Sequence, residues 1–198
     1  MNRFENWFCG SSLWRAITER RLLPWVLSGY SLGDHVLEIG AGPGAATNEL
    51  RRRSSRVTSL EYDGSSVAKL AAKLDGNNAS VLQGDAARLP FANETFSCVI
   101  AILVLHHLKS KEPQNRAFAE AHRVLRPAGV FLACEIQDGW LQRAGHLKST
   151  FVPVQPSSAF ARLDAAGFCK IAVEFQSGAF RICALRARET RALAATAR

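Results

Sequence analysis

A glycine-rich turn after a short apolar segment is the part of the sequence best suited to hold a cofactor. Gly40, Gly42 and Ala45 have the G-x-G-x-x-A spacing with which dinucleotide-binding proteins cradle a pyrophosphate. Two neighbouring residues oppose that ligand. Glu38 would repel a pyrophosphate but attract an ammonium group, and Pro43 lacks one of the N–H groups that bind phosphate. The turn therefore favours a ligand with a cationic amino group over a dinucleotide.

Acidic residues follow the next two strand candidates. Glu61 ends the segment 57–61, where a carboxylate can accept hydrogen bonds from both hydroxyls of a ribose. Tyr62, its neighbour, offers a ring to stack on an adenine. Asp85 is suited to accept a hydrogen bond from an adenine amino group while the N–H of Ala86 faces a ring nitrogen, although an Asp that caps a short turn is the alternative. These positions predict an adenosine pocket.

Two adjacent histidines, His106 and His107, follow the apolar run 96–102. Ligands of open α/β sheets gather at the carboxyl ends of the strands, and imidazole is the commonest general base near neutral pH. The pair is therefore the candidate for a catalytic base. The alternative is that both rings only line or structure the pocket.

Short apolar runs alternate with helical patterns along the chain, which is typical of a parallel sheet built from βαβ units. The patterns predict strands at 35–39, 56–60, 79–82, 96–102, 130–134, 169–174 and 179–187, and helices at 11–27, 45–53, 114–125 and 157–166. A further helix, capped by Asp63, Ser65 or Ser66, is expected to run through Leu74, and 137–155 is expected to be irregular. The helix 11–27 should pack on the core or cover a pocket.

Five segments in this order resemble the motifs of the class I S-adenosylmethionine (SAM)-dependent methyltransferases. They are His35–Ala45, Val57–Asp63, Leu82–Phe91, Phe96–Leu108 and Arg123–Val130. The likeness is closest to the methyltransferase type 11 group, which includes quinone C-methyltransferase-like proteins, and it extends over about 33–187. It implies an α/β, Rossmann-like seven-stranded sheet in the order 3-2-1-4-5-7-6, with the last strand antiparallel and helices on both faces.

The resemblance also implies roles for particular residues. Gly40, Ala41 and Gly42 would line the methionyl part of SAM, with Glu38 near its amino group. Glu61 would hold the ribose, Tyr62 and Ala86 would flank the adenine, and Asp85 would bond the adenine amino group. Ala101 and Ile102 would contact the methionyl chain near the sulfonium. The product would be S-adenosylhomocysteine, and no metal is expected.

The expected reaction is an in-line SN2 transfer of the methyl group to a small molecule. The cover over the strand ends would come from Phe4, Trp7, Phe8, Trp14 and the segment 140–151, which supply aromatic side chains. The alternative is that these residues only seal the core. A nucleic-acid acceptor is not favoured, because Ile102–Leu105 lacks the Asn/Asp-Pro-Pro-aromatic motif of base amino-methyltransferases and no cysteine is placed as the RNA cytosine-C5 enzymes require. Two alternatives stay open. One is a non-catalytic subunit that binds SAM or S-adenosylhomocysteine, and the other is an RNA or protein methyltransferase. Glu38 and Pro43 oppose a NAD-dependent oxidoreductase.

The length of 198 residues and the ordinary composition fit one globular domain. We divide it into a helical cover (1–32), a catalytic fold (33–187) and a basic tail (188–198). The net charge of +8 is scattered, and its cluster Arg51–Arg53 fits the negative end of a helix better than a nucleic-acid patch. The oligomeric state stays open.

Five cysteines without a C-x-x-C pair predict small buried thiols in a reducing compartment, with no zinc site and no disulfide framework. The charged N-terminus leaves no room for the apolar core of a signal peptide, and the uncharged run 95–108 is too short to span a bilayer. A cytoplasmic location without a membrane span is therefore expected.

Overall fold

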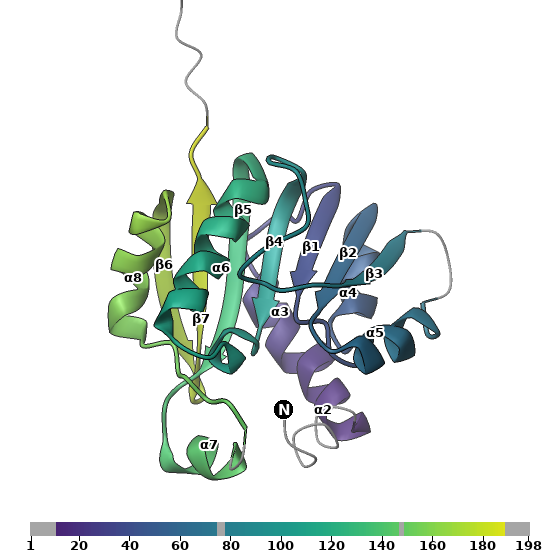
Figure 1. The fold of residues 1–198 in the computed structure, drawn as a ribbon, viewed down its shortest axis with the longest axis horizontal. Coiled ribbons are helices and arrows are strands. Elements are labelled where there is room, and N and C mark those ends of the chain that lie inside the picture. Colours follow the sequence, from purple (N-terminus) through teal and green to yellow (C-terminus); the bar gives the residue numbers. More distant parts are fainter. Residues whose placement is uncertain (1–10, 75–77, 147–148, 189–198) are drawn as a thin grey trace, which may run out of the picture.

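The computed structural model describes residues 11–74, 78–146 and 149–188, and these form one seven-stranded sheet in the order β3-β2-β1-β4-β5-β7-β6 (Figure 1). The strands are β1 (His35–Ile39), β2 (Arg56–Glu61), β3 (Ala79–Gln83), β4 (Phe96–Ile102), β5 (Leu125–Ile136), β6 (Phe168–Gln176) and β7 (Ala179–Arg186). β7 runs antiparallel to both of its neighbours, whereas the pairs among β1 to β5 are parallel. The predicted strand order and the antiparallel last strand are confirmed.

Helices precede β1 and alternate with most of the strands along the chain, in line with the alternating pattern of the sequence. They are α2 (Ser12–Ile17), α3 (Leu23–Leu27), α4 (Thr47–Arg53), α5 (Gly64–Ala71), α6 (Lys111–Val124), α7 (Trp140–Gly145) and α8 (Pro156–Ala165), with a π-helical turn at Thr18–Leu22 and a 3₁₀ turn at Leu105–His107. Asp63 caps α5, since its carboxylate accepts the N–H of Ser66 at 2.8 Å. The expectation that 137–155 has no regular structure is wrong at α7.

The largest difference from the predicted bounds lies between α6 and β5. The helix begins at Lys111, and Pro113 is compatible with it because it lies in the first turn. The helix passes into the strand at Leu125 without a loop. β5 pairs with β4 through Leu125 and Phe96, then resumes at Val130 and Cys98. Pro127 lies in the irregularity between these two pairs, which explains how a proline stands inside a central strand.

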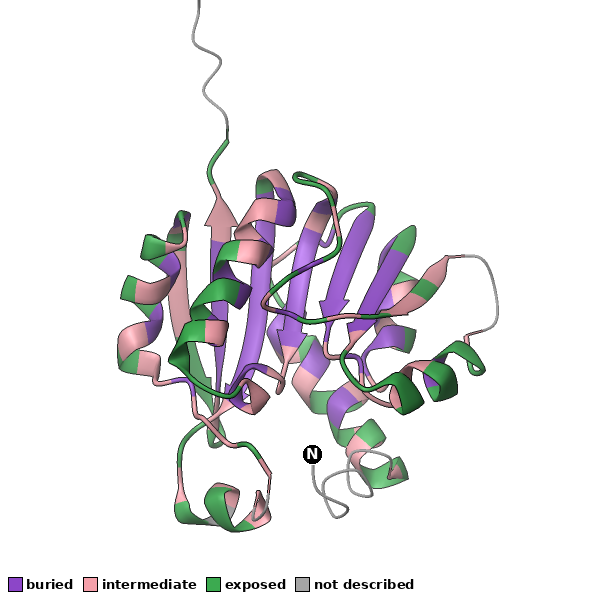
Figure 2. Ribbon diagram, viewed as in Figure 1, coloured by how far each residue is buried: buried purple, intermediate pink, exposed green. Residues whose placement is uncertain are grey.

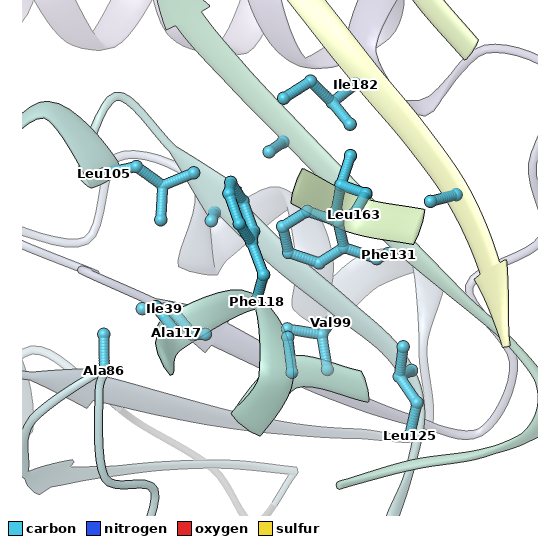
Figure 3. Close-up of a cluster of buried hydrophobic side chains, with 14 of the residues drawn as sticks. Ile39, Ala86, Val99, Leu105, Ala117, Phe118, Leu125, Phe131, Leu163 and Ile182 are labelled. Carbon is cyan, nitrogen blue, oxygen red and sulfur yellow. The ribbon is translucent and has the colours of Figure 1, made fainter. Parts of the chain in front are cut away.

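Apolar side chains cover both faces of the sheet, and Figure 2 shows its central strands buried along most of their length. On one face α6 and α8 pack over strand residues such as Leu37 and Val99, and Figure 3 shows part of this cluster around Phe118 and Phe131. On the other face α3 and the region of α4 pack over a second set that includes Val36. The helices expected on both faces are therefore present.

The N-terminal helical region, predicted as one helix over 11–27, runs without a break from α2 through the π-helical turn to α3, and its two ends differ in burial. Leu23, Val26 and Leu27 of α3 are buried in the second cluster, so this part packs on the core. α2 has no buried residue, and Figure 1 shows it, like α7, beyond the edge of the sheet at which the parallel strands end. The predicted cover residues Phe4, Trp7 and Phe8 lie outside the described residues.

Candidate functional site

The glycine turn leaves β1 with a backbone that only glycine adopts without strain. Gly40, Gly42 and Gly44 have φ values of 74°, 51° and 86°. The N–H of Gly40 donates to the Leu60 carbonyl at 2.8 Å, which draws the turn toward the end of β2. A Cβ at Gly40 would lie 2.7 Å from Cβ of Val104, whereas one at Gly42 would meet nothing within 4 Å. The turn is thus packed on one side and open on the other.

Glu38 lies inside the molecule, below this turn. Its Oε2 accepts hydrogen bonds from the Thr47 hydroxyl at 2.7 Å and the Ser59 hydroxyl at 2.6 Å, so the carboxylate joins β1 to α4 and β2. Burial raises the pKa of Glu38, and the two hydroxyl donors oppose that shift. The structure therefore gives Glu38 a fixed place beside the turn, and its contact with a methionyl amino group stays a prediction.

Glu61 ends β2 and faces the glycine turn. Its Oε2 accepts the N–H of Gly42 at 2.9 Å, and its Oε1 accepts the N–H of Asp63 at 2.9 Å. Each carboxylate oxygen has a second lone pair, so both can still accept from a ribose hydroxyl. The adjacent Tyr62 is 71% exposed, which leaves its ring available to a ligand. The two residues predicted to hold the nucleoside are thus brought beside the turn.

Asp85 forms the capped turn that the sequence left as the alternative. Its Oδ1 accepts the N–H of Ala87 at 2.8 Å, and its carbonyl accepts the N–H of Arg88 at 3.0 Å. The preceding Gly84 donates its N–H to the Glu61 carbonyl at 3.0 Å, which places this turn next to the end of β2. Ala86 is buried within the apolar cluster. Their predicted contacts with adenine stay predictions.

The end of β4 lies directly beside the glycine turn, because Ala101 pairs with Ile39 of β1. The Ala101 side chain is fully buried, and Ile102 is half-buried against the second cluster. Val104, which the sequence analysis did not single out, packs against Gly40. The ends of β1, β2 and β4 therefore meet where the resemblance places a cofactor.

His106 is buried and is held by an acid that sequence reasoning missed. Its Nδ1 lies 2.5 Å from Oε2 of Glu135, which is itself fully buried near the end of β5. Oε1 of Glu135 accepts the N–H groups of Val104 at 3.1 Å and Leu105 at 2.8 Å. The only signal in the sequence is an acid next to the apolar run 130–134, since the pairing depends on β4 and β5 being neighbours.

His107 is brought near a third histidine, which the sequence analysis did not single out. His146, which follows α7, has its ring centroid 5.5 Å from that of His107 and 5.1 Å from that of His106. Phe151 stacks on His146 at 4.4 Å. The two predicted base candidates thus belong to an aromatic cluster, and the segment after β5 supplies part of it.

Other predicted features have simpler places in the fold. Arg51–Arg53 end α4, where Arg53 pairs with Glu49 at 2.6 Å and Arg51 lines a surface hollow of about 340 Å³ that no predicted cofactor residue lines. Cys98, Cys134 and Cys183 are buried free thiols, Cys169 is half-buried, and Cys9 lies outside the described residues. None of the helices in the described ranges is long and apolar enough to cross a membrane.

Comparison with known sequences agrees with this arrangement. Residues 37–133 match a family described as a methyltransferase domain. The demethylmenaquinone methyltransferase of Thermobifida fusca is 31% identical over 106 residues, which are 52% of this chain and 44% of that protein. The sterol 24-C-methyltransferase of Eremothecium gossypii is 30% identical over 137 residues, or 67% of this chain and 36% of that protein. The chain thus spans about half, or less, of the length of these curated relatives.

Solved structures share the fold at low sequence identity. The PH0226 protein of Pyrococcus horikoshii has a TM-score of 0.76 and 20% identity, covering 90% of this chain and 93% of its own. A Haloferax volcanii protein solved with the Trm112 methyltransferase activator has a TM-score of 0.74 and 15% identity, covering 95% of this chain and 99% of its own. The matched domain, the named relatives and the strand order agree: residues 37–133 belong to the methyltransferase domain family, and the described strands have the order expected of a class I SAM-dependent methyltransferase.

Proposed function

We propose that this protein transfers a methyl group from SAM to a small-molecule acceptor and releases S-adenosylhomocysteine. The observation that carries the proposal is the hydrogen bond from Gly42 to the Glu61 carboxylate, beside a left-handed turn whose Gly42 faces open space. A nucleoside needs a carboxylate for its hydroxyls and a turn without side chains for the atoms beyond them. Both features are present at the ends of neighbouring strands.

The proposed binding roles follow the order of the strands. Gly40, Ala41 and Gly42 would line the methionyl chain with Glu38, Glu61 would hold the ribose, Tyr62, Asp85 and Ala86 would bind adenine, and Ala101 and Ile102 would lie near the sulfonium. When bound, SAM supplies an activated methyl group. The chain itself has to align an acceptor with that methyl group, and such alignment can lower a barrier by about 7–11 kcal/mol.

A base, where the acceptor requires one, would come from the histidines after β4. Glu135 holds the Nδ1 side of His106, which fixes the ring orientation and leaves Nε2 to take a proton. His107 follows on the same 3₁₀ turn. The turn begins directly after Val104, the residue that packs on Gly40, which supports a place for the histidines near the transferred methyl group.

Two further observations support the choice of acceptor and setting. Relatives are named for demethylmenaquinone and sterol acceptors, which supports a small molecule over a nucleic acid. The buried free thiols of Cys98, Cys134 and Cys183 suit a reducing compartment such as the cytoplasm. We propose that residues 1–198 act as a single domain, with 1–32 as cover, 33–187 as catalytic fold and 188–198 as a basic tail.

Calorimetric titration with SAM, S-adenosylhomocysteine and NAD tests the cofactor. We expect both SAM species to bind and NAD not to bind; binding of NAD alone would overturn the proposal.

Glu61→Ala removes two charged hydrogen bonds to the ribose, each worth about 1.5–3 kcal/mol, so SAM affinity should fall by at least about 100-fold. Glu112→Ala, at an exposed carboxylate on α6, is the matched control and should leave SAM affinity unchanged.

Because Glu61 also binds backbone N–H groups of the turn, circular dichroism should first establish that Glu61→Ala keeps the native fold. Unchanged SAM affinity in that folded variant would remove Glu61 from the site. Methyl transfer is then tested by S-adenosylhomocysteine formation with a panel of quinones, sterols and phenols. SAM binding without turnover on any acceptor would favour the non-catalytic subunit instead.

A further inference from the structure

Three imidazoles from two separate parts of the chain meet beyond the ends of β4 and β5. His106 and His107 follow β4, whereas His146 follows α7. One ring nitrogen from each lies within 4.8 Å of one from each of the others. His106 is buried, and the other two rings are half-exposed, so the cluster opens toward solvent on one side.

Each of the three rings has an oxygen acceptor at its Nδ1. The partners are the Glu135 carboxylate for His106 at 2.5 Å, the Thr150 carbonyl for His107 at 3.3 Å and the Gln142 carbonyl for His146 at 2.6 Å. Carbonyl and carboxylate oxygens only accept, so Nδ1 carries a proton, and in the neutral ring the lone pair is on Nε2. Metal-binding histidines have this arrangement, with the second nitrogen donating to a carboxylate or a backbone carbonyl.

The frame around the rings is well connected. The Val152 N–H donates to the His106 carbonyl at 2.8 Å, and the buried Gln114 side chain donates to the carbonyls of Leu105 at 3.1 Å and Val152 at 2.7 Å. These bonds fasten 150–152 to the 3₁₀ turn that carries His106 and His107. The position of the rings is therefore set by backbone contacts as well as by stacking.

We propose that His106, His107 and His146 bind one divalent transition-metal cation such as Zn²⁺ through their Nε2 atoms. Imidazole nitrogens suit Zn²⁺, Co²⁺, Ni²⁺ and Cu²⁺, whereas Mg²⁺ and Ca²⁺ need oxygen ligands. Tetrahedral zinc with Zn–N bonds of about 2.0–2.1 Å places its ligand atoms roughly 3.4 Å apart. The half-exposed rings of His107 and His146 would close onto the metal, while Glu135 holds His106 in place.

Such a site has three protein ligands and an open fourth position, the arrangement of zinc centres that also bind water or a ligand oxygen. Ligation would use the Nε2 atom that a general base would use, so this assignment replaces the base role of both His106 and His107. The cysteine spacing gave no indication of a metal site. The three histidines come together only through the fold, so the sequence did not reveal them as a ligand set. The site does not depend on the proposed methyl transfer.

Titration of the chelator-treated full chain with Co²⁺, followed by Zn²⁺ competition, tests the proposal. We expect one Co²⁺ per chain, with the intense visible absorption of tetrahedral coordination and no thiolate charge-transfer band. His107→Asn and His146→Asn should each weaken Zn²⁺ binding by about 100-fold or more, and Glu135→Gln by about 10–100-fold, as the loss of an outer partner does. His122→Asn, at a histidine outside the cluster, is the matched control and should bind Zn²⁺ normally.

Circular dichroism of each variant establishes that it is folded, and calorimetry without SAM keeps the result separate from methyltransferase function. Absence of a tetrahedral Co²⁺ spectrum in the native chain would overturn the proposal. An equal loss of Zn²⁺ affinity in His122→Asn and His146→Asn would do so too, as would a thiolate band, which would assign the metal to cysteine.

Discussion

Glu38 and Glu61 show how two carboxylates close to one turn take different tasks. Glu38 is surrounded by protein and accepts two hydroxyl hydrogen bonds, whereas Glu61 accepts backbone N–H groups at the exposed rim. Burial raises the pKa of Glu38 because the charged form loses its hydration, and the negative charge of Glu61 adds to the shift. The pH dependence of stability can therefore report on Glu38.

Glu38→Gln should gain stability relative to the native chain as pH rises. The raised pKa means that the folded state holds the proton of Glu38 more tightly than the unfolded state does. Its contribution to the free energy of unfolding is thus fully present below the ordinary value of 4.5 and is lost as pH rises through the raised value. Urea unfolding of both proteins between about pH 4 and pH 8 measures this difference. A native-minus-variant difference that grows with pH would contradict it.

The residues of the site differ in how well sequence can predict them. The glycine turn and Glu61 are short-range features, because each follows directly from the end of a strand and the strands are neighbours in the sheet. Glu135 and His146 were missed because their contacts with His106 join segments that only the β4–β5 pairing and the chain after β5 bring together. Local spacing therefore predicts the proposed cofactor side better than the histidine cluster.

At the scale of elements, apolar runs predict the strands well, and β1 and β4 have the predicted bounds. The error between α6 and β5 has a physical cause that the local sequence does not reveal. Pro127 and Gly129 are typical of a loop, but the irregular register with β4 accommodates both within the strand. The end of α6 depends in addition on Arg186 of β7, a contact across more than sixty residues.

Arg186→Met should destabilise the fold because Arg186 binds the carbonyl groups at the end of α6. Its Nη1 donates to the carbonyls of His122, Arg123 and Leu125 at 3.2, 3.1 and 2.6 Å. Helix ends leave carbonyls without helical partners, and charged hydrogen bonds of this kind contribute about 1.5–3 kcal/mol. We expect a loss of that size in the free energy of unfolding, measured in urea.

The matched control is Arg188→Met, two residues further along and exposed. A surface change of this kind should stay within about 0.5 kcal/mol. If both variants lose equal stability, the loss would not come from the hydrogen bonds at the end of α6, and the role of Arg186 there would be wrong.

At the scale of the whole molecule, the sequence predicts the strand order only through its resemblance to a family, since alternating patterns alone do not fix which strands are neighbours. The placement of the N-terminal region is likewise set by distant contacts. Arg181 of β7 donates through Nη1 to the Trp25 and Ser28 carbonyls, and through Nη2 to both carboxylate oxygens of Glu174 at 3.1 and 2.9 Å. One side chain thus joins the end of α3 to the two last strands.

Arg181→Met tests whether this connection holds the N-terminal helices on the sheet. Methionine keeps most of the apolar stem while it leaves the Trp25 and Ser28 carbonyls without their charged donor. Stability should fall by about 1.5–3 kcal/mol. The substitution should increase the rate of amide hydrogen exchange more in 12–27 than in β1 or β4. The reason is that α3 packs on the sheet next to the lost contact and α2 is continuous with α3.

Arg116→Ala, which removes an exposed ion pair with Glu112 on α6, is the arginine control for this variant. An exposed pair at this spacing contributes about 0.3–0.5 kcal/mol, so the control should leave exchange in 12–27 unchanged. α2 projects beyond the same edge of the sheet as the glycine turn. If 1–32 acts as a cover, Arg181→Met should therefore weaken SAM binding as well as increase the exchange rate in 12–27. Faster exchange with unchanged SAM affinity would instead make α3 a structural helix and remove the cover role from the N-terminal region.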